Sequence, residues 1–267
     1  MSAPRTVVIT GASAGIGEAL ALELAARGDR VVLAARRRPE LERVAAEAER
    51  RGAPSAVVVP ADVTRREDVN RLRDTALDVL GAVDVWVNNA GRGVVRPVLE
   101  LTDAEFDAVM DVNVRSALYG MQAIAPYFVE RNAGHLINIS SFLGRVPLVT
   151  FRSAYNAAKA ALNALTANVR VDLRARAPGV HVSLVMPGIV TTEFARNALN
   201  APANSPPFRT PARNETMKPQ APDEVARAIA ELIDHPVPEL YTNPASAELA
   251  RRYYADVGAF EAAAAAR

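Results

Sequence analysis

Short runs of β-branched and other apolar residues alternate with longer amphipathic segments along most of the chain. The strand-like runs are Val7 to Thr10, Val31 to Ala34, Ala56 to Val59, Val83 to Val87, Leu136 to Ile139 and Val180 to Val185. The helical segments between them are Ile16 to Arg27, Glu40 to Arg51, Arg65 to Leu80, Asp103 to Glu130 with a break expected near Pro126, and Ala154 to Arg176. Continuous apolar runs suit a parallel sheet that is covered on both faces. The alternation therefore predicts an α/β protein built from βαβ crossovers.

The pattern changes after Pro187-Gly188. A proline-rich stretch at about 193–221 would interrupt any regular helix or strand repeatedly. The elements expected beyond it are a helix at Asp223 to Asp234, a short strand near Glu239 to Thr242, and an alanine-rich tail at about 245–267 that is helical at least to Asp256. No internal repeat and no linker divides the 267 residues, so we predict one domain spanning 1–267.

Composition excludes several kinds of protein. Half of the residues are hydrophobic (50%), which supports a large core, and the formal net charge of +1 gives no whole-chain attraction to nucleic acid or to a membrane. The absence of cysteine excludes disulfides and thiolate chemistry, and the three histidines are not spaced as metal ligands. Without a signal-peptide pattern or a run of roughly 18 apolar residues, we expect a cytoplasmic protein.

A glycine-rich turn, Thr10-Gly11-Ala12-Ser13-Ala14-Gly15-Ile16-Gly17, separates the first expected strand from the first expected helix. Glycines there permit a tight turn and a close approach of the backbone to a pyrophosphate, while the helix N-terminus offers free N–H groups. A plain tight turn is the alternative interpretation. The predicted cofactor contacts in this turn are Gly11, Ser13, Ala14, Gly15, Ile16 and Gly17.

The second expected strand runs into Arg36-Arg37-Arg38, near the position where dinucleotide-binding folds place an acidic residue for the ribose 2′-hydroxyl. No carboxylate is available in this run, and a guanidinium would instead bind a 2′-phosphate. The sequence therefore favours NADP(H) over NAD(H), with Arg36 as the principal contact and Arg37 as its partner. Alternatively, the arginines only begin a solvated helix, which is our interpretation of Arg38.

Tyr155 and Lys159 lie four residues apart in the segment Ser153-Ala154-Tyr155-Asn156-Ala157-Ala158-Lys159. On a helix they share a face, and a lysine held beside a tyrosine favours the phenolate. We therefore expect the pKa of Tyr155 to fall from its reference of about 10 toward neutrality, where the phenol can act as an acid or a base. Taken alone, such a pair is more often a simple surface pair.

With the glycine turn, the Tyr-x-x-x-Lys pair and the intervening Asn88-Asn89-Ala90-Gly91, the chain resembles the short-chain dehydrogenase/reductase family in its compact form. The resemblance spans Thr6 to Thr192. It implies a doubly wound, Rossmann-like three-layer sandwich around a mostly parallel seven-stranded sheet. The further cofactor contacts that it implies are Asp62 and Val63 at the adenine and Asn89, Ala90 and Gly91 beside the ribose.

Three more positions take roles from this resemblance. Asn113 matches the asparagine that kinks a central helix and holds a water of a proton relay; alternatively, it is a helix asparagine satisfied by backbone groups. Ser141 matches the serine that donates a hydrogen bond to the substrate oxygen, with Ser140 as the second choice. Pro187-Gly188-Ile189-Val190-Thr191-Thr192 matches the segment that binds the nicotinamide carboxamide in the family. The contacts that the resemblance implies are Pro187, Gly188, Ile189 and Thr192.

The segment between Ser141 and Tyr155 is slightly longer than the family pattern, and we expect it to reshape the substrate pocket. The sequence leaves the chemistry of that pocket open. Side chains that would form an apolar wall are Phe142, Leu143, Val146, Pro147, Phe151, Phe194 and Phe208. Side chains that would instead hold an anion are Arg92, Arg145, Arg152 and Arg209.

The resemblance implies an oxidoreductase that interconverts a carbonyl and an alcohol by hydride transfer, with Asn113, Ser141, Tyr155 and Lys159 as its catalytic residues, and the arginines after the second strand favour NADP(H) as its cofactor. It also implies a small-molecule substrate, a substrate lid at about 193–221, and a homodimer or homotetramer. One alternative is a non-enzymatic NADP(H)-sensing protein, but such proteins generally lack the tyrosine or the lysine. The other is a sugar-nucleotide epimerase or dehydratase, whose glycine turn is spaced differently.

Overall fold

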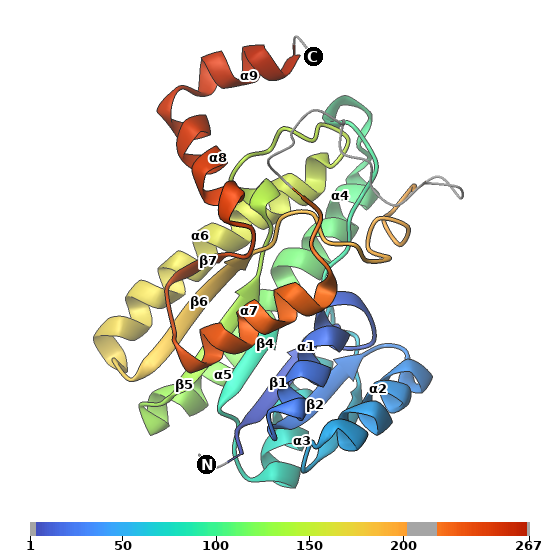
Figure 1. Ribbon diagram of the computed structural model, residues 1–267, viewed down its shortest axis with the longest axis vertical. Coiled ribbons are helices and arrows are strands. Elements are labelled where there is room, and N and C mark those ends of the chain that lie inside the picture. Colours follow the sequence, from blue (N-terminus) through green and yellow to red (C-terminus); the bar gives the residue numbers. More distant parts are fainter. Residues whose placement is uncertain (1–3, 202–217, 266–267) are drawn as a thin grey trace.

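The computed structural model describes residues 4–201 and 218–265, and within them seven strands form one sheet (Figure 1). The strands are β1 Thr6–Thr10, β2 Arg30–Ala35, β3 Ala56–Pro60, β4 Val85–Asn88, β5 Gly134–Ile139, β6 Val180–Met186 and β7 Glu239–Tyr241. Their order is β3-β2-β1-β4-β5-β6-β7. All six neighbouring pairs are parallel. The predicted fold class is confirmed, and the sheet is wholly rather than mostly parallel.

Helices cover both faces of this sheet. They are α1 Gly15–Ala26, α2 Arg38–Arg51, α3 Arg66–Leu80, α4 Asp103–Met110, α5 Ser116–Arg131, α6 Ser153–Arg176, α7 Pro222–Asp234, α8 Pro244–Ala255 and α9 Val257–Ala265. Successive side chains of a strand point to opposite faces. Val7 and Ile9 of β1 accordingly pack in the core beneath α1, α2 and α7, whereas Val8 packs in the core beneath α3, α5 and α6. The predicted three-layer arrangement follows from this alternation.

The sequence predicted a helix from Asp103 to Glu130 with a break near Pro126. The structure has the interruption elsewhere. Pro126 lies inside α5 and does not end it, whereas a π-helical turn, Asp111–Arg115, separates α4 from α5. In this turn the N–H of Ser116 donates to the carbonyl of Asp111, five residues back. A π turn widens the helix locally and is common at functional sites. The interruption therefore lies at Asn113, the residue to which the resemblance assigns a kink.

The carboxyl ends of the strands carry the features that matter for function. The strand order reverses between β1 and β4, and open α/β sheets bind ligands in the crevice at such a switch point. The glycine turn follows β1 at this edge, and Asn89-Ala90-Gly91 follows β4. Ser141 follows β5, and Pro187 follows β6. Most predicted site residues are thus brought to one edge by the topology alone.

The C-terminal part continues beyond that edge. The tail is helical through α8 and α9, further than the sequence predicted, and both helices extend past the rest of the molecule (red in Figure 1). α8 packs through Ala250 and Tyr253 against Phe142 and Val146. Within residues 4–201 and 218–265, no helix is both long and apolar enough to cross a membrane.

The described parts of the proline-rich stretch, 193–201 and 218–221, contain no helix or strand until α7 begins. Isolated bridges join Val94 to Leu199 and Val190 to Gln220, so both ends of the stretch are held beside the site. The middle of the predicted lid, including Phe208 and Arg209, lies outside the described residues. The assignment of this stretch as a lid stays a prediction.

Candidate active site

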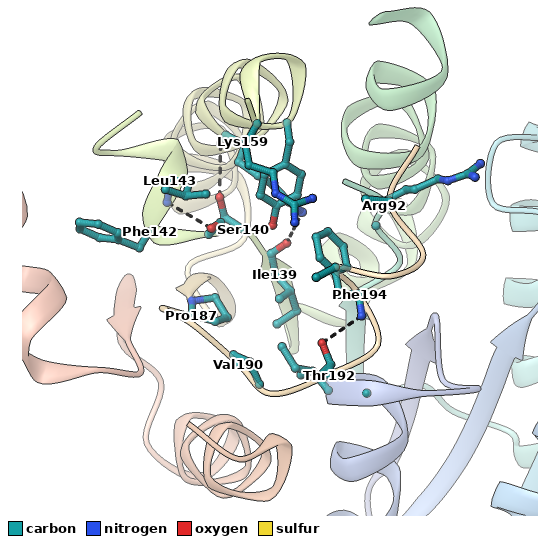
Figure 2. A pocket seen from close by; sticks show the side chains of 18 of the residues that line it. Arg92, Ile139, Ser140, Phe142, Leu143, Lys159, Pro187, Val190, Thr192 and Phe194 are labelled. Atoms are coloured by element: carbon teal, nitrogen blue, oxygen red, sulfur yellow. Dashed lines mark hydrogen bonds between the residues drawn. The ribbon is translucent and has the colours of Figure 1, made fainter. Parts of the chain in front are cut away.

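One large cavity, with a volume of ≈ 1910 Å³, lies at the carboxyl edge of the sheet. Figure 2 shows part of its lining, with Lys159 at the centre, Phe142 and Leu143 on one side, and Phe194 and Arg92 on the other. The predicted site residues all line this cavity except Gly17 and Asn113. Residues of the glycine turn, the Asn-Asn-Ala-Gly motif and the Tyr-x-x-x-Lys pair therefore line the same cavity.

The glycine turn has the backbone form that a phosphate site requires. Gly11 and Gly15 have φ angles of +68° and +60°, a region in which a side chain is strained. α1 begins at Gly15, and the Ala14 N-cap has no side chain that could bind the first N–H groups. These donors, together with the positive end of the helix dipole, are free to bind an anion.

Asn89 fixes the glycine turn to the end of β4. Its Nδ2 donates to the carbonyl of Thr10 at 2.8 Å and to that of Gly11 at 3.3 Å. The hydroxyl of Thr10 in turn accepts from the N–H groups of Asn89 and Ala90. Gly17 lies just behind, where a Cβ would meet both Asn89 Nδ2 and the Gly11 carbonyl oxygen at 2.5 Å. Gly17 therefore supports the turn without lining the cavity.

We expect Gly17→Ala to destabilise the fold and to weaken dinucleotide binding, although alanine is normally the better helix former. The added methyl must displace Asn89, and overpacking of this kind costs about 1–3 kcal/mol. Thermal unfolding and cofactor titration measure the two effects. Gly258→Ala in α9 is the matched control, because its nearest neighbour atom would lie 3.7 Å away. Equal melting temperatures for the two variants would contradict the packing role of Gly17.

Arg36 and Arg37 lie exposed at the end of β2, on the rim of the cavity. Arg37 is held by an ion pair with Glu40 at 3.0 Å and by a 3.4 Å hydrogen bond from its Nη2 to Ser13 Oγ in the glycine turn. Among the described residues, Arg36 has no ion pair. The Arg37 guanidinium is therefore held beside the glycine turn, whereas Arg36 lines the cavity and is available to a ligand.

Asp62 lies on the cavity wall near these arginines, in the loop after β3. Its Oδ1 accepts hydrogen bonds from the backbone N–H and the hydroxyl of Thr64, which orient the carboxylate. Its own N–H donates to Asp68 at 2.8 Å. Val63, which follows it, also lines the cavity. Both residues thus line the cavity, and their role as an adenine contact stays a prediction.

The two serines after β5 have different surroundings. Ser140 donates to Asn163 Oδ1 at 2.5 Å and to the Lys159 carbonyl at 3.3 Å, so its hydroxyl ties β5 to α6. Ser141 Oγ accepts from the N–H of Leu143 at 3.1 Å and forms a hydrogen bond with the Tyr155 phenol. Ser141 is thus the serine that faces the tyrosine, as the sequence favoured.

Tyr155 and Lys159 are both buried in the first two turns of α6. Lys159 Nζ donates to the carbonyl of Ile139 at 2.8 Å and lies 5.6 Å from the centre of the Tyr155 ring (Figure 2). The ring of Phe194 packs against Tyr155, with 5.3 Å between ring centres. The pair is therefore an interior arrangement rather than a surface pair.

The predicted fall in the Tyr155 pKa is wrong for this structure. Burial raises the pKa of Tyr155 to about 12, against the opposing effects of the Ser141 hydrogen bond and the Arg152 charge. Burial also lowers the pKa of Lys159 to about 7. The physical reason is that desolvation disfavours the charged form of each group. The lysine ammonium, moreover, is directed at the Ile139 carbonyl and not at the phenol oxygen.

Arg152 is a second buried cation beside the tyrosine. It lines the cavity at 5% exposure, and its Nη1 donates to the Val94 carbonyl at 3.4 Å. Burial lowers its pKa, and the Tyr155 charge acts in the opposite direction. A Cβ on Gly93 would lie 2.5 Å from Arg152 Nη1, so a larger residue at position 93 would displace the guanidinium. The sequence offered Arg152 as a possible anion ligand, but its position beside the phenol was not foreseen.

Asn113 lies buried in the π turn behind the cavity. Its Nδ2 donates to the carbonyls of Arg92 and Val109, both at 2.8 Å, and its Oδ1 accepts from the N–H of Arg92 at 3.3 Å. The alternative interpretation, a helix asparagine satisfied by backbone groups, thus describes this side chain. Its hydrogen bonds to Arg92 hold the segment after Gly91 in place. A role in water binding stays a prediction.

Comparison with known proteins gives a family. The family model for short chain dehydrogenases matches residues 5–203. The chain belongs to the short-chain dehydrogenase family. An uncharacterized oxidoreductase of Staphylococcus aureus (strain USA300) is 34% identical over 87% of this chain and 92% of its own length. The uncharacterized oxidoreductase YxnA of Bacillus subtilis (strain 168) is 34% identical over 89% of this chain, which spans only 65% of YxnA.

Two solved dehydrogenase structures are similar in fold to this family member. A short-chain dehydrogenase/reductase from Burkholderia phymatum, in complex with NAD, has a TM-score of 0.84 at 29% identity and covers 95% of this chain and 94% of its own. An alcohol dehydrogenase from Thermococcus sibiricus, complexed with 5-hydroxy-NADP, has a TM-score of 0.75 at 28% identity, with 89% and 95% covered. Both nicotinamide dinucleotides thus occur among its structural neighbours.

The substrate end of this short-chain dehydrogenase is lined by some of the predicted apolar residues. Phe142, Leu143, Val146 and Phe194 line the cavity, whereas Pro147 and Phe151 do not. Of the candidate anion ligands, Arg145 pairs with Glu239 outside the cavity, and Arg92 donates to the Asn197 carbonyl at the rim. Sequence reasoning missed the contribution of α8 and α9 to the lining. The spacing of Ala259, Phe260, Ala263 and Ala264 on one helical face was the available signal.

Proposed function

We propose that this short-chain dehydrogenase interconverts a carbonyl and an alcohol with NADP(H), and that Tyr155 is its general acid and base. The observation that carries the proposal is the meeting of Tyr155, Ser141 and Lys159 at one end of a cavity that continues to the glycine turn. A phenol and a hydroxyl that face the same space can both bind a single substrate oxygen.

The residues along the cavity suit a dinucleotide phosphate. The uncapped N-terminus of α1 would bind the pyrophosphate, and Arg36 with Arg37 would bind the 2′-phosphate. Asp62 would contact the adenine end. Thr192 lies against the glycine turn, because a Cβ on Gly15 would be 3.4 Å from its methyl group. The segment from Pro187 to Thr192, which also lines the cavity, would bind the nicotinamide carboxamide.

A bound nicotinamide would supply the hydride to a carbonyl carbon in reduction or accept it from an alcohol carbon in oxidation. Tyr155 gives its proton to the substrate oxygen in the reductive direction and removes it in the oxidative direction. Ser141 donates a hydrogen bond to the same oxygen as negative charge develops there. Lys159, fixed by the Ile139 carbonyl, would contact the nicotinamide ribose and stabilise the phenolate once the proton has left. Asn113 would support the path by which Tyr155 is reprotonated.

The raised pKa of Tyr155 favours the reductive direction. With a pKa of about 12 the phenol carries its proton at neutral pH and is ready to donate it. The oxidative direction requires phenolate, which burial opposes and which the Ser141 hydrogen bond and the Arg152 charge favour. We therefore expect ketone or aldehyde reduction to be the faster direction at neutral pH.

Cofactor choice gives a separate prediction. Arg36→Asp should weaken NADPH binding at least about tenfold, because a charge-assisted hydrogen bond contributes roughly 1.5–3 kcal/mol and the new carboxylate repels the 2′-phosphate. The kcat/KM with NADH should stay the same or rise. Arg38→Asp is the matched control, since Arg38 pairs with Glu42 and does not line the cavity. An unchanged ratio of NADPH to NADH efficiency in Arg36→Asp would remove Arg36 from the cofactor site.

Two other functions remain as alternatives, and steady-state turnover separates them. A cofactor-sensing protein would bind NADPH tightly but oxidise it with no ketone, aldehyde or quinone. A sugar-nucleotide epimerase or dehydratase would convert its substrate without net NADPH consumption. The cytoplasmic location, the small-molecule substrate and the homodimer or homotetramer inferred from the sequence stay predictions.

A further inference from the structure

The cavity is larger than a dinucleotide site alone requires. Ligand pockets usually measure about 300–1,000 Å³, whereas this cavity measures ≈ 1910 Å³. The proposed dinucleotide contacts all lie on the side of the glycine turn and of Pro187 to Thr192. The remaining lining comes from the segment after Ser141, from α8 and α9, and from a third side formed by Arg92, Ala108, Asp111, Val112, Arg152 and residues 193–198. This second branch begins at the reacting end of the site, so it is the place for the rest of the substrate.

The first wall of this branch directly follows the catalytic serine. Its members are all apolar: Phe142, Leu143, Val146, Leu148 and Val149. Asn156 of α6 holds the end of this wall by donating to the carbonyls of Pro147 and Val149. This is the segment that the sequence led us to expect to reshape the substrate pocket. Its lining residues form an apolar surface that follows Ser141.

The second wall comes from the C-terminal helices. Leu249 of α8 and a set of small or aromatic residues of α9 face the same cavity. The α9 members are Ala259, Phe260, Ala263 and Ala264. Their spacing places them along one face of the helix. No residue of α9 is buried in the described structure, so this apolar face is open to the cavity.

The two walls belong to one hydrophobic cluster, which fixes how they face each other. Phe142 and Val146 of the first wall pack with Ala250 and Tyr253 of α8, and Phe260 packs against the same cluster. The rings of Tyr253 and Phe260 meet edge to face, with 5.6 Å between their centres. The Tyr253 hydroxyl donates to Glu261 at 3.1 Å, which anchors α9 to α8. α9 is thus held as a wall of the cavity.

We propose that the substrate carries an extended apolar chain, which lies between the segment 142–149 and α9 while its carbonyl or alcohol group meets Tyr155 and Ser141. The inference rests on the proposed function. Among the described lining residues of the two walls, 142–149 and 249–264, the charged side chains are Arg252 and Asp256, both exposed at the end of α8. An apolar chain would cover the open face of α9 and remove it from water.

The test uses straight-chain methyl ketones from butanone to dodecanone with NADPH. Each added methylene should raise kcat/KM about two- to fourfold, because burying one methylene gains ~0.8 kcal/mol, which corresponds to about fourfold. The gain should appear mainly as a lower KM, since the chain makes the same contacts before and during the reaction. The increase in kcat/KM should stop once the ketone is longer than the branch.

Ala263→Asp is the diagnostic variant, and Ala262→Asp is its matched control. Both place one carboxylate on α9, but Ala263 lines the cavity and Ala262 does not. Ala263→Asp should abolish the dependence of KM on chain length, because the carboxylate would have to be desolvated beside hydrocarbon. Ala262→Asp should retain that dependence. Helical content measured by circular dichroism shows whether the C-terminal helices are equally folded in the two variants.

The outcomes separate this inference from the proposed function. Turnover of butanone with no gain for longer ketones would overturn the apolar-chain assignment and leave the proposed function standing. Equal effects of Ala262→Asp and Ala263→Asp would also overturn it. A higher kcat/KM for keto acids than for methyl ketones of equal length would assign the branch to an anion instead. Absence of turnover with every carbonyl and alcohol tested would overturn the proposed function and this inference together.

Discussion

Tyr155→Phe should reduce turnover by about a thousandfold or more while NADPH binding changes little. The substitution removes one hydroxyl and keeps the ring that packs against Phe194, so the fold should be preserved. General acid catalysis typically contributes about 10²–10⁴-fold, and here the proton donor to the substrate oxygen is lost altogether. The glycine turn and Arg36, which would hold the dinucleotide, are untouched.

The measurement for this variant is kcat with a reducible carbonyl, together with a direct titration of NADPH. Tyr127→Phe is the matched control, because that hydroxyl binds Arg131 on α5 and does not line the cavity. Turnover like that of the wild type in Tyr155→Phe would remove Tyr155 from the reaction. A large loss of NADPH affinity would instead show that the phenol is mainly a cofactor contact.

Lys159→Met should also reduce turnover by about a thousandfold, and it should weaken cofactor binding as well. Methionine fills nearly the same space but cannot donate to Ile139, contact a ribose hydroxyl or stabilise phenolate. Lys218→Met is the matched control, since Lys218 is exposed and does not line the cavity. Retained turnover in Lys159→Met would contradict the role given to the lysine.

The same variant tests the lowered pKa of Lys159 through stability. The folded pKa, about 7, lies below the ordinary value of 10.5, so the unfolded chain binds more protons between these values. Wild-type stability should therefore rise with pH across this window, and the methionine variant should lack that contribution. The melting temperature of Lys159→Met relative to wild type should be higher near pH 7 than near pH 10. A difference that does not change with pH would show that the lysine is not desolvated.

The sequence predicted the fold well because the signals for it are local. Continuous apolar runs and helical periods along the chain identify strands and helices, and the parallel arrangement follows from their alternation. The π turn at Asn113 was not predicted from the pattern, because it depends on how that side chain binds Arg92 across the fold. Pro126, the local signal for a break, is accommodated inside α5.

The site shows the same division between local and non-local signals. Glycine spacing and the Tyr-x-x-x-Lys pair located the residues, but the pKa of Tyr155 depends on burial by residues such as Phe194, which lies far away in the sequence. Desolvation outweighs the charges around the phenol, and no spacing rule encodes it. The facing of α9 toward the cavity likewise depends on packing between Phe260 and Tyr253.

The central claim is hydride transfer between a nicotinamide and a carbonyl, with Tyr155 as the proton donor. The most direct measurement follows the absorbance of NADPH and of NADH with a panel of ketones, aldehydes and quinones, for wild type and Tyr155→Phe side by side. We expect wild-type protein to consume NADPH with at least one apolar carbonyl, and Tyr155→Phe to consume it about a thousandfold more slowly or less. Tight NADPH binding by the wild type without consumption in either direction would contradict the claim and identify a cofactor-sensing protein.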